Sequence, residues 1–232
     1  MRFANDRERI AGMEQKIEYK FHNKDYLIIA ITHSSYANEQ KPPVMYNERL
    51  EFLGDAVLEL VMSDYLYHHY PLEPEGKLTK MRAGLVCEPT LAACATDLCL
   101  GNYLYLGKGE ELTGGRERES ILSDAFESVI GAIYLDGGME PAKTFIIKHL
   151  LNDVEDRMMF YDAKTILQEK VQGKYKEQPV YELIETKGSQ NQPIFHVRVF
   201  VRGKALGDGE GRNKKAAEQM AAYNALKDEK RK

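Results

Sequence analysis

The sequence predicts two domains of different fold class: an all-α helical bundle, followed by a small α+β domain with the order α-β-β-β-α. Apolar residues recur every three to four positions up to about residue 157, which is typical of amphipathic helices. Beyond residue 162 the apolar residues alternate, as they do in strands. The charge divides at the same place, because residues 1–161 carry a net charge of −9 and residues 162–232 a net charge of +5.

The first domain is predicted to be helical along almost its whole length. Proline- and glycine-rich stretches at 41–43, 71–76 and 135–141 punctuate the pattern. The segments with helical periodicity are 10–17, 26–37, 50–70, 78–98, 119–138 and 141–158. Together they predict a helical bundle.

The second domain begins with a predicted helix at 163–175. YELIETK and FHVRVFV then predict two strands, and KALGDGEG a third. A last helix is expected from about 213 to 228, and both helices should cover one face of the sheet. The predicted boundaries are therefore 1–157 for the bundle, 158–161 for a linker and 162–232 for the small domain.

Composition excludes some classes of protein. With 232 residues, 43% of them hydrophobic, the chain can form a globular core. No apolar run approaches the roughly 20 residues that span a bilayer, and MRFANDRERIAGMEQ lacks the apolar centre of a signal peptide. We expect a cytoplasmic protein without a membrane partner. Cys87, Cys94 and Cys99 match no metal-binding spacing, so they are predicted to be reduced thiols.

One predicted helix, NERLEFLGDAVLELVM at 47–62, carries acids beside its apolar face. Glu48, Glu51 and Asp55 fall within a sector of about 60°. Like charges at this spacing repel, and carboxylates next to a core protonate unless a cation compensates them. Gly54 weakens the helix beside Asp55, which indicates the close approach of another helix or chain.

The segment ILSDAFESVIGAIYL repeats this pattern with Asp124 and Glu127. Two such helices can face each other and form a site made only of oxygen ligands, which suits Mg²⁺ or Mn²⁺. The alternative is that all these acids are solvated. That explanation suffices for any single acid, but it is less suited to the set, because both helices are apolar around most of their circumference.

The last helix begins with Lys214 and Lys215, which oppose the helix dipole. Their position is favourable if the helix start faces phosphates, while the alternative is a solvated helix end. Alanines along this helix should allow close packing on the sheet, and the glycines of GDGEG are interpreted as turn residues. His33 is interpreted as a structural histidine, and His68 and His69 as surface groups.

These motifs resemble the ribonuclease III family. The resemblance rests on NERLEFLGDAVL at 47–58, THSSYANE at 32–39, PEGKLTKMRAGLV at 74–86 and ESILSDAFESVIGAIYLD at 119–136. Residues 162–227 resemble a double-stranded RNA binding domain. The resemblance implies a homodimeric, Mg²⁺-dependent endoribonuclease of double-stranded RNA, in which Mn²⁺ can substitute. Its products would carry 5′-phosphate and 3′-hydroxyl ends with short 3′ overhangs. The enzyme would act in rRNA and mRNA processing.

The resemblance also implies roles for individual residues of the first domain. Glu51, Asp55, Asp124 and Glu127 match the acids that bind the metal, with Asp55 and Glu127 essential for cleavage. Glu48 and Glu75 match supporting acids near the subunit interface. Phe52 matches an aromatic residue that inserts into a socket on the partner subunit; its alternative is an ordinary core phenylalanine.

In the second domain the resemblance implies RNA contacts from both helices and one loop. Thr165, Gln168 and Glu169 match the first helix, which contacts the minor groove. Lys214 and Lys215 match the lysine-bearing start of the second helix. The loop at 189–193 lacks the histidine that the family often has there, so Gln190 or Asn191 is expected to take its contact.

Two functions from other classes are alternatives to this one. A non-catalytic RNA-binding or structural protein could keep the fold, but such relatives generally lose some of these acids, and all six are present. A metal-dependent phosphohydrolase of nucleotides would not need the basic second domain.

Overall fold

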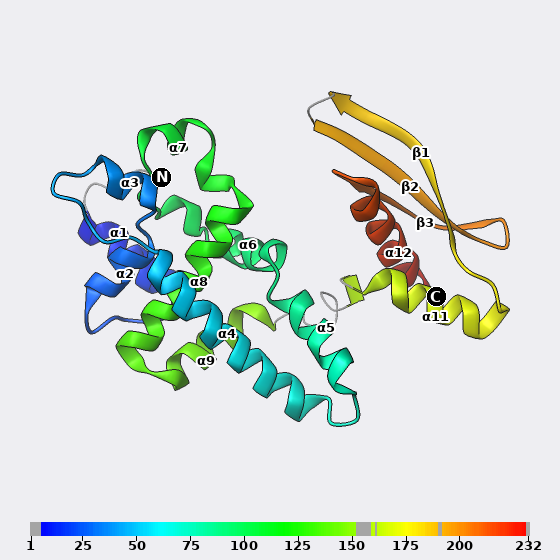
Figure 1. Cartoon of the computed structure of the whole chain (residues 1–232), viewed down its shortest axis with the longest axis horizontal. Coiled ribbons are helices and arrows are strands. Elements are labelled where there is room, and N and C mark those ends of the chain that lie inside the picture. The colour runs from blue at the N-terminus through cyan, green and yellow to red at the C-terminus, as the bar shows by residue number, and fades with distance from the viewer. Residues whose placement is uncertain (1–5, 152–158, 161, 190–191, 231–232) are drawn as a thin grey trace. The chain divides into compact units, whose positions relative to one another are not determined.

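The computed structural model describes residues 6–151, 159–160, 162–189 and 192–230. The chain divides into two compact units, Met1–Val154 and Glu155–Lys232, each of which is described by itself (Figure 1). Met158 and Tyr161 of the predicted linker lie outside the described residues, and Met159 is buried in the core of the C-terminal unit. The exact domain boundaries therefore stay predictions. No described helix is both long and apolar enough to cross a membrane.

The described part of the N-terminal unit is built from helices, as the periodicity predicts. Its α-helices and short 3-10 helices are α1 (Asp6–Ile17), α2 (Lys24–Ala30), α3 (Ser34–Glu39), α4 (Glu48–His69), α5 (Glu75–Leu85), α6 (Glu88–Asp97), η1 (Leu100–Asn102), α7 (Lys108–Leu112), η2 (Gly115–Glu117), α8 (Glu119–Gly137) and α9 (Met139–Leu150).

Two expected helices are each divided in two. The segment 26–37 forms α2 and α3, because Thr32 leaves the helix to form a bridge with Tyr105. The segment 78–98 forms α5 and α6, with Cys87 in an extended conformation between them. Pro89 lies in the first turn of α6, where its missing N–H costs nothing, whereas inside a continuous helix it would remove a hydrogen bond.

The centre of the N-terminal unit is the contact between α4 and α8. A Cβ atom on Gly54 would lie 1.8 Å from the backbone oxygen of Glu127, and one on Gly131 would lie 2.3 Å from the backbone oxygen of Leu50. The two backbones therefore touch at this glycine crossing, formed by Gly54 and Gly131. The close approach that Gly54 predicts is confirmed, and the partner is a helix of the same chain.

The C-terminal unit has the predicted order of elements. Its elements are α11 (Ala163–Tyr175), β1 (Val180–Ser189), β2 (Gln192–Val201), β3 (Lys204–Gly211) and α12 (Lys214–Lys230). The sheet is antiparallel with the order β1-β2-β3, and α12 packs on β2 and β3. Leu167, Val197, Val199 and Leu226 belong to its buried core.

The glycines of GDGEG lie within β3, so their interpretation as turn residues is wrong. A Cβ on Gly207 would lie 2.5 Å from the backbone oxygen of Ala221, and one on Gly209 2.2 Å from its backbone nitrogen. These positions lack side chains because α12 packs directly against the strand. Ala217 and Ala221 are fully buried there, which confirms the expected close packing of the alanine-rich helix.

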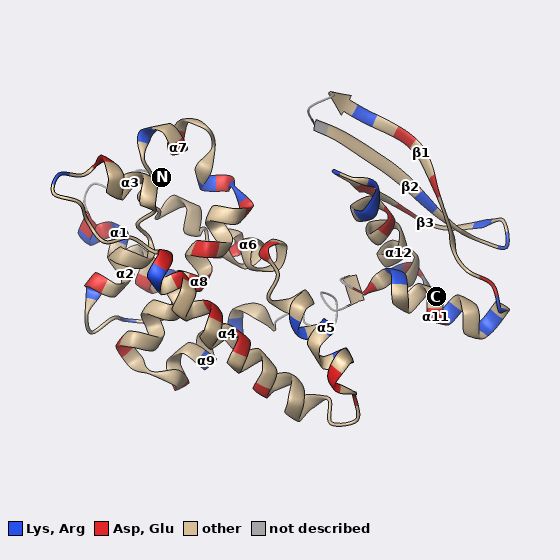
Figure 2. Cartoon of the chain, in the orientation of Figure 1, with Lys and Arg blue, Asp and Glu red and all other residues tan. Residues whose placement is uncertain are grey.

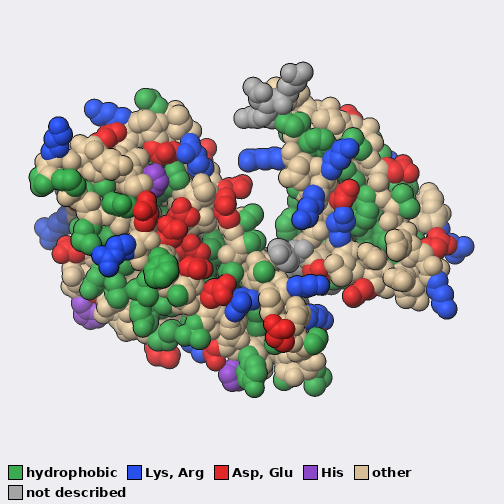
Figure 3. Space-filling view, viewed as in Figure 1, with side chains coloured by type: hydrophobic (Ala, Val, Ile, Leu, Met, Phe, Trp, Pro, Cys, Tyr) green, Lys and Arg blue, Asp and Glu red, His purple; other side chains and the backbone are tan. Residues whose placement is uncertain are grey.

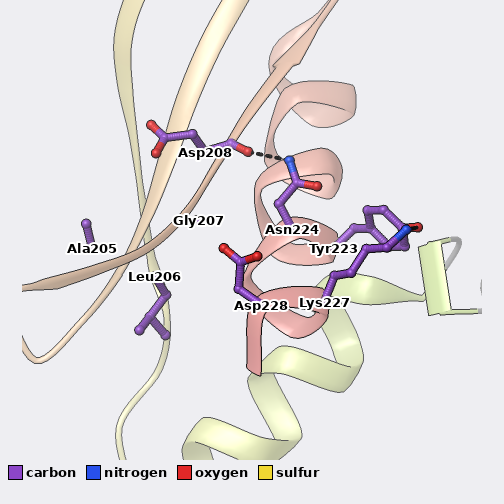
Figure 4. Close-up of a pocket in the computed structure, with 8 residues that line it drawn as sticks. All are labelled: Ala205, Leu206, Gly207, Asp208, Tyr223, Asn224, Lys227 and Asp228. Carbon is purple, nitrogen blue, oxygen red and sulfur yellow. Dashed lines mark hydrogen bonds between the residues drawn. The ribbon is translucent and has the colours of Figure 1, made fainter. Parts of the chain in front are cut away.

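A groove of about 570 Å³ lies between β3 and the second half of α12 (Figure 4). In it the side-chain amide of Asn224 donates a hydrogen bond of 2.8 Å to the backbone oxygen of Asp208. This hydrogen bond joins α12 to β3 across the groove.

The glycine crossing leads to a prediction about stability. Gly54→Ala should lower the free energy of unfolding by about 3 kcal/mol, because α4 and α8 must separate to admit the methyl group. Gly76→Ala is the matched control, since no atom lies within 4 Å of its Cβ and alanine favours a helix. Thermal and urea unfolding measure both variants. Equal stability of the two variants would contradict the crossing.

Candidate metal centre and nucleic-acid interface

The start of α4 is fixed by hydrogen bonds to two other segments. The backbone N–H of Asn47 donates to the oxygen of Thr32 at 2.9 Å, and the hydroxyl of Ser128 on α8 donates to the oxygen of Asn47 at 3.3 Å. Asn47 is buried. These bonds hold the first turn of α4 against the part of α8 that carries Glu127.

Glu51 of α4 and Asp124 and Glu127 of α8 form one group, here called the acid cluster. One carboxylate oxygen from each lies within 4.8 Å of the others, and all three side chains are half-buried. The glycine crossing produces this proximity, because Gly54 packs directly on the backbone of Glu127. In the space-filling view, acidic side chains gather into a patch on the N-terminal unit (Figure 3).

The other predicted acids of the first domain are not part of the acid cluster. Asp55 and Glu48 are exposed on α4. Asp55 follows Gly54, which packs on the backbone of Glu127, and the charge of Asp55 raises the pKa of Glu127. Glu75 is exposed in the first turn of α5, where the hydroxyl of Thr79 donates to it at 3.0 Å.

Burial and mutual repulsion disfavour the ionised forms of the three carboxyl groups of the acid cluster. Burial, followed by the charges of Asp55, Glu51 and Asp124, raises the pKa of Glu127 to about 8. Burial is also the main cause of the raised pKa of Glu51 and of Asp124. The hydrogen bond from Ser123 opposes the shift in the pKa of Asp124, but it does not reverse its direction.

The donor set of the acid cluster fits a divalent cation. Among the ion pairs of the described residues, none involves Glu51, Asp124 or Glu127. Three carboxylates without a basic partner leave negative charge that a small hard ion can compensate through oxygen ligands. Mg²⁺ and Mn²⁺ both match these ligands.

Two neighbours of the cluster are not apparent from the sequence. Glu88, the first residue of α6, raises the pKa of Asp124, whereas His33 lowers it when protonated. Glu88 follows a helix break and has no periodic relation to α4 or α8. Only the packing of α6 on α8 brings it to the cluster. His33 lies in the THSS motif, whose pattern indicates a structural histidine.

The first helix of the C-terminal unit presents its predicted polar residues to solvent. Thr165, Gln168 and Glu169 are exposed on α11, at a spacing that places them on one face of the helix. The opposite face is buried through Leu167 and Val171. Gln190 and Asn191, the predicted loop contacts, lie outside the described residues.

Lys214 and Lys215 are exposed in the first turn of α12, where Figure 2 shows basic residues. The side chain of Asn213 accepts a hydrogen bond of 2.9 Å from the backbone N–H of Ala216. Within the described residues neither lysine takes part in an ion pair. Cations, free backbone amides and the helix dipole thus favour an anion at this helix start.

Phe52 is not a core residue. Its side chain is 79% exposed although it lies between Glu51 and the glycine crossing on α4. Leu60 and Tyr67 are also exposed on this helix. Exposed apolar side chains along one helix mark an interaction surface.

Comparisons with known proteins agree with this arrangement. The family model described as "Ribonuclease-III-like" matches residues 23–154, and the "Double-stranded RNA binding motif" matches residues 163–229. A protein named Ribonuclease 3 from Caldanaerobacter subterraneus subsp. tengcongensis is 47% identical, over 92% of this chain and 95% of its own length. A protein of the same name from Clostridium tetani is 48% identical, over 94% of this chain and 93% of its own.

A solved structure also matches the first unit. The nuclease domain of ribonuclease III from Campylobacter jejuni is 46% identical, with a TM-score of 0.57, and the match covers 61% of this chain and 99% of that one. The family models and the near full-length relatives cover both units in the same order. The chain therefore belongs to the ribonuclease III family.

Proposed function

We propose that the chain is an endoribonuclease that hydrolyses double-stranded RNA with a divalent metal ion, Mg²⁺ or in its place Mn²⁺. The observation that supports this best is the acid cluster, whose three carboxylates lie within 4.8 Å of one another and have no basic partner among the described residues. The same chain carries a double-stranded RNA binding motif, which supports a duplex as the substrate.

Each acid has a proposed role. Glu51, Asp124 and Glu127 would hold the ion, which when bound supplies an activated water and stabilises charge on the leaving oxygen. Asp55 is exposed beside Glu127 and would complete the ligand set or orient the attacking water. Glu48 adds negative charge next to Glu51 and Asp124, and Glu75 keeps its supporting role as a prediction.

The products and the assembly are also proposals. Hydrolysis would leave 5′-phosphate and 3′-hydroxyl ends, with short 3′ overhangs if two sites cut opposite strands. Two sites require a homodimer, which the exposed Phe52 supports. The nuclease domain of the Campylobacter jejuni relative has a region involved in dimer formation. Roles in rRNA and mRNA processing and a cytoplasmic location stay predictions.

Glu127→Gln should separate cleavage from binding. Cleavage of a defined duplex should fall at least about 10²-fold, because the change removes a charged metal ligand. RNA affinity should persist, since the change removes a metal ligand and none of the proposed phosphate contacts. Gel assays with end-labelled duplex measure both, with the exposed Glu140→Gln as control. If Glu127→Gln lost RNA binding together with cleavage, the role of Glu127 as a metal ligand would be contradicted. If the parent protein bound RNA but did not cleave it, a non-catalytic RNA-binding protein would be favoured.

The same variant tests the electrostatics of the cluster. Because the pKa of Glu127 is raised to about 8, the metal-free fold binds this proton more tightly than the unfolded chain. Stability of the metal-free protein should therefore fall as the pH rises from about 5 to about 8. Glu127→Gln should reduce this dependence to the part that comes from Glu51 and Asp124. Mg²⁺ should restore stability to the parent protein. Thermal melts at several pH values with EDTA or Mg²⁺ measure the effect; a flat profile for the parent protein would exclude it.

Replacing both lysines of α12, Lys214→Ala with Lys215→Ala, should weaken RNA binding. Two lost phosphate contacts should reduce the slope of log affinity against log salt by about 2. Lys174→Ala with Lys204→Ala is the control, because Lys204 begins β3 at the β2–β3 turn, and Lys174 lies over the ring of Tyr175, which also contacts Arg202 of that turn. Fluorescence anisotropy at four salt concentrations gives both slopes, and an unchanged slope in the first variant would refute the contact.

Phe52→Asp should shift the protein from dimer to monomer, because a charge would be buried in an apolar contact. Leu112→Asp is the control, since Leu112 is 87% exposed on α7. Analytical ultracentrifugation measures the mass of both variants. A Phe52→Asp variant that stays dimeric would mean that the interface lies elsewhere.

A further inference from the structure

The backbone of His33 is fixed next to the start of α4. Its N–H donates to the oxygen of Tyr105 at 3.1 Å, and the oxygen of the preceding residue, Thr32, accepts from the N–H of Asn47 at 2.9 Å. Glu48 follows Asn47 and opens α4. The THSS turn is therefore tied directly to the helix that supplies Glu51 to the acid cluster.

The ring of His33 is oriented by its Nδ1 atom. The backbone N–H of Ser35 donates to Nδ1 at 3.2 Å, so this nitrogen is an acceptor and carries no proton. The hydroxyl of Ser35 lies 2.8 Å from the same nitrogen and accepts from the N–H of Gly107 at 2.9 Å, which leaves its own proton free to point at Nδ1. The neutral ring therefore carries its proton on Nε2.

The Nε2–H of His33 has no acceptor within the described protein, since the hydrogen bonds of this ring all involve Nδ1. The oxygen of Asn47 in turn accepts from the hydroxyl of Ser128, the residue after Glu127, so hydrogen bonds connect the THSS turn to the helix that carries two of the cluster acids. The charge of His33 also lowers the pKa of Asp124, which agrees with this connection. A fixed donor without a protein acceptor thus lies beside a group of carboxylates. An RNA phosphate that approaches this group is repelled by the acids and needs such donors.

We propose that Nε2–H of His33 donates a hydrogen bond to a non-bridging phosphate oxygen of the RNA strand bound at the acid cluster. His33 would then be a further catalytic residue, in addition to the acids. This inference rests on the proposed function. The THSS turn would then have two roles, capping α3 and contacting the RNA.

Two substitutions of His33 distinguish the acceptor role of Nδ1 from the donor role of Nε2. In His33→Asn the side-chain oxygen can still accept from Ser35, and asparagine is a favourable helix N-cap, but the donor at the Nε2 position is lost. In His33→Gln the amide nitrogen can reach the Nε2 position, while the cap is weakened. The cleavage rate should therefore depend on the donor at the Nε2 position, and the melting temperature on the hydrogen bond that caps α3.

Single-turnover cleavage of a defined duplex with Mg²⁺ provides the main test. His33→Asn should reduce the cleavage rate by about 10- to 100-fold. Its melting temperature should stay within about 2 °C of the parent value. His33→Gln should recover part of the rate at a lower melting temperature. His68→Asn, which removes an exposed histidine of α4, should change neither quantity.

NMR and EPR measurements, which do not depend on cleavage activity, complete the test. Proton–nitrogen NMR of the metal-free protein should show His33 protonated at Nε2, and EPR titration should show the same Mn²⁺ affinity for His33→Asn and the parent protein. The inference would be overturned by a parent-like cleavage rate in His33→Asn, or by a proton on Nδ1 of His33. Weaker Mn²⁺ binding by His33→Asn would also overturn it, because His33 would then act through Asp124. The proposed function fails separately, if the parent protein itself cuts no duplex RNA.

Discussion

The N-terminal unit depends on the backbone contact between α4 and α8. Two glycines, Gly54 and Gly131, allow the helices to approach so closely that no Cβ atom fits between them. Side chains on either side of the contact are then brought within reach of one another. Glu51 meets Asp124 and Glu127 because it is one turn from Gly54, whose neighbour across the contact is Glu127 itself. The geometry of the acids is thus a consequence of how two apolar helices pack.

This packing has an electrostatic cost that no ion pair among the described residues offsets, although the charge of His33 opposes it at Asp124. Burial and repulsion raise the pKa values of all three cluster acids, with Glu127 the most affected. Such a site is destabilising when empty and favourable when a cation occupies it, so metal affinity and folding stability are linked. The same excess of negative charge repels an RNA phosphate. Donors at the margin of the cluster, such as His33, therefore gain importance for substrate binding.

The C-terminal unit uses the same packing principle for a different purpose. Alternate glycines of β3 let the alanine-rich α12 lie directly on the sheet. This close packing fixes the direction of α12, and with it the position of its first turn. Lys214 and Lys215 extend from that turn into solvent, where they add to the positive end of the helix dipole. In both units, small residues at a helix contact determine where charged side chains are placed.

The sequence by itself determined the two fold classes, the order of their elements, and the presence of acids beside apolar helix faces, because periodicity and composition are local properties. It also indicated the close contact at Gly54. It did not separate α2 from α3, where the division depends on a bridge to Tyr105, more than 70 residues away. It did not distinguish the cluster acids from Asp55 and Glu48, or identify Glu88 as a neighbour of Asp124. It left open whether Phe52 is buried, and it assigned the β3 glycines to a turn. Only the tertiary structure decided these points, since distances between side chains on separate elements, and the burial that shifts their pKa values, arise when the elements pack together.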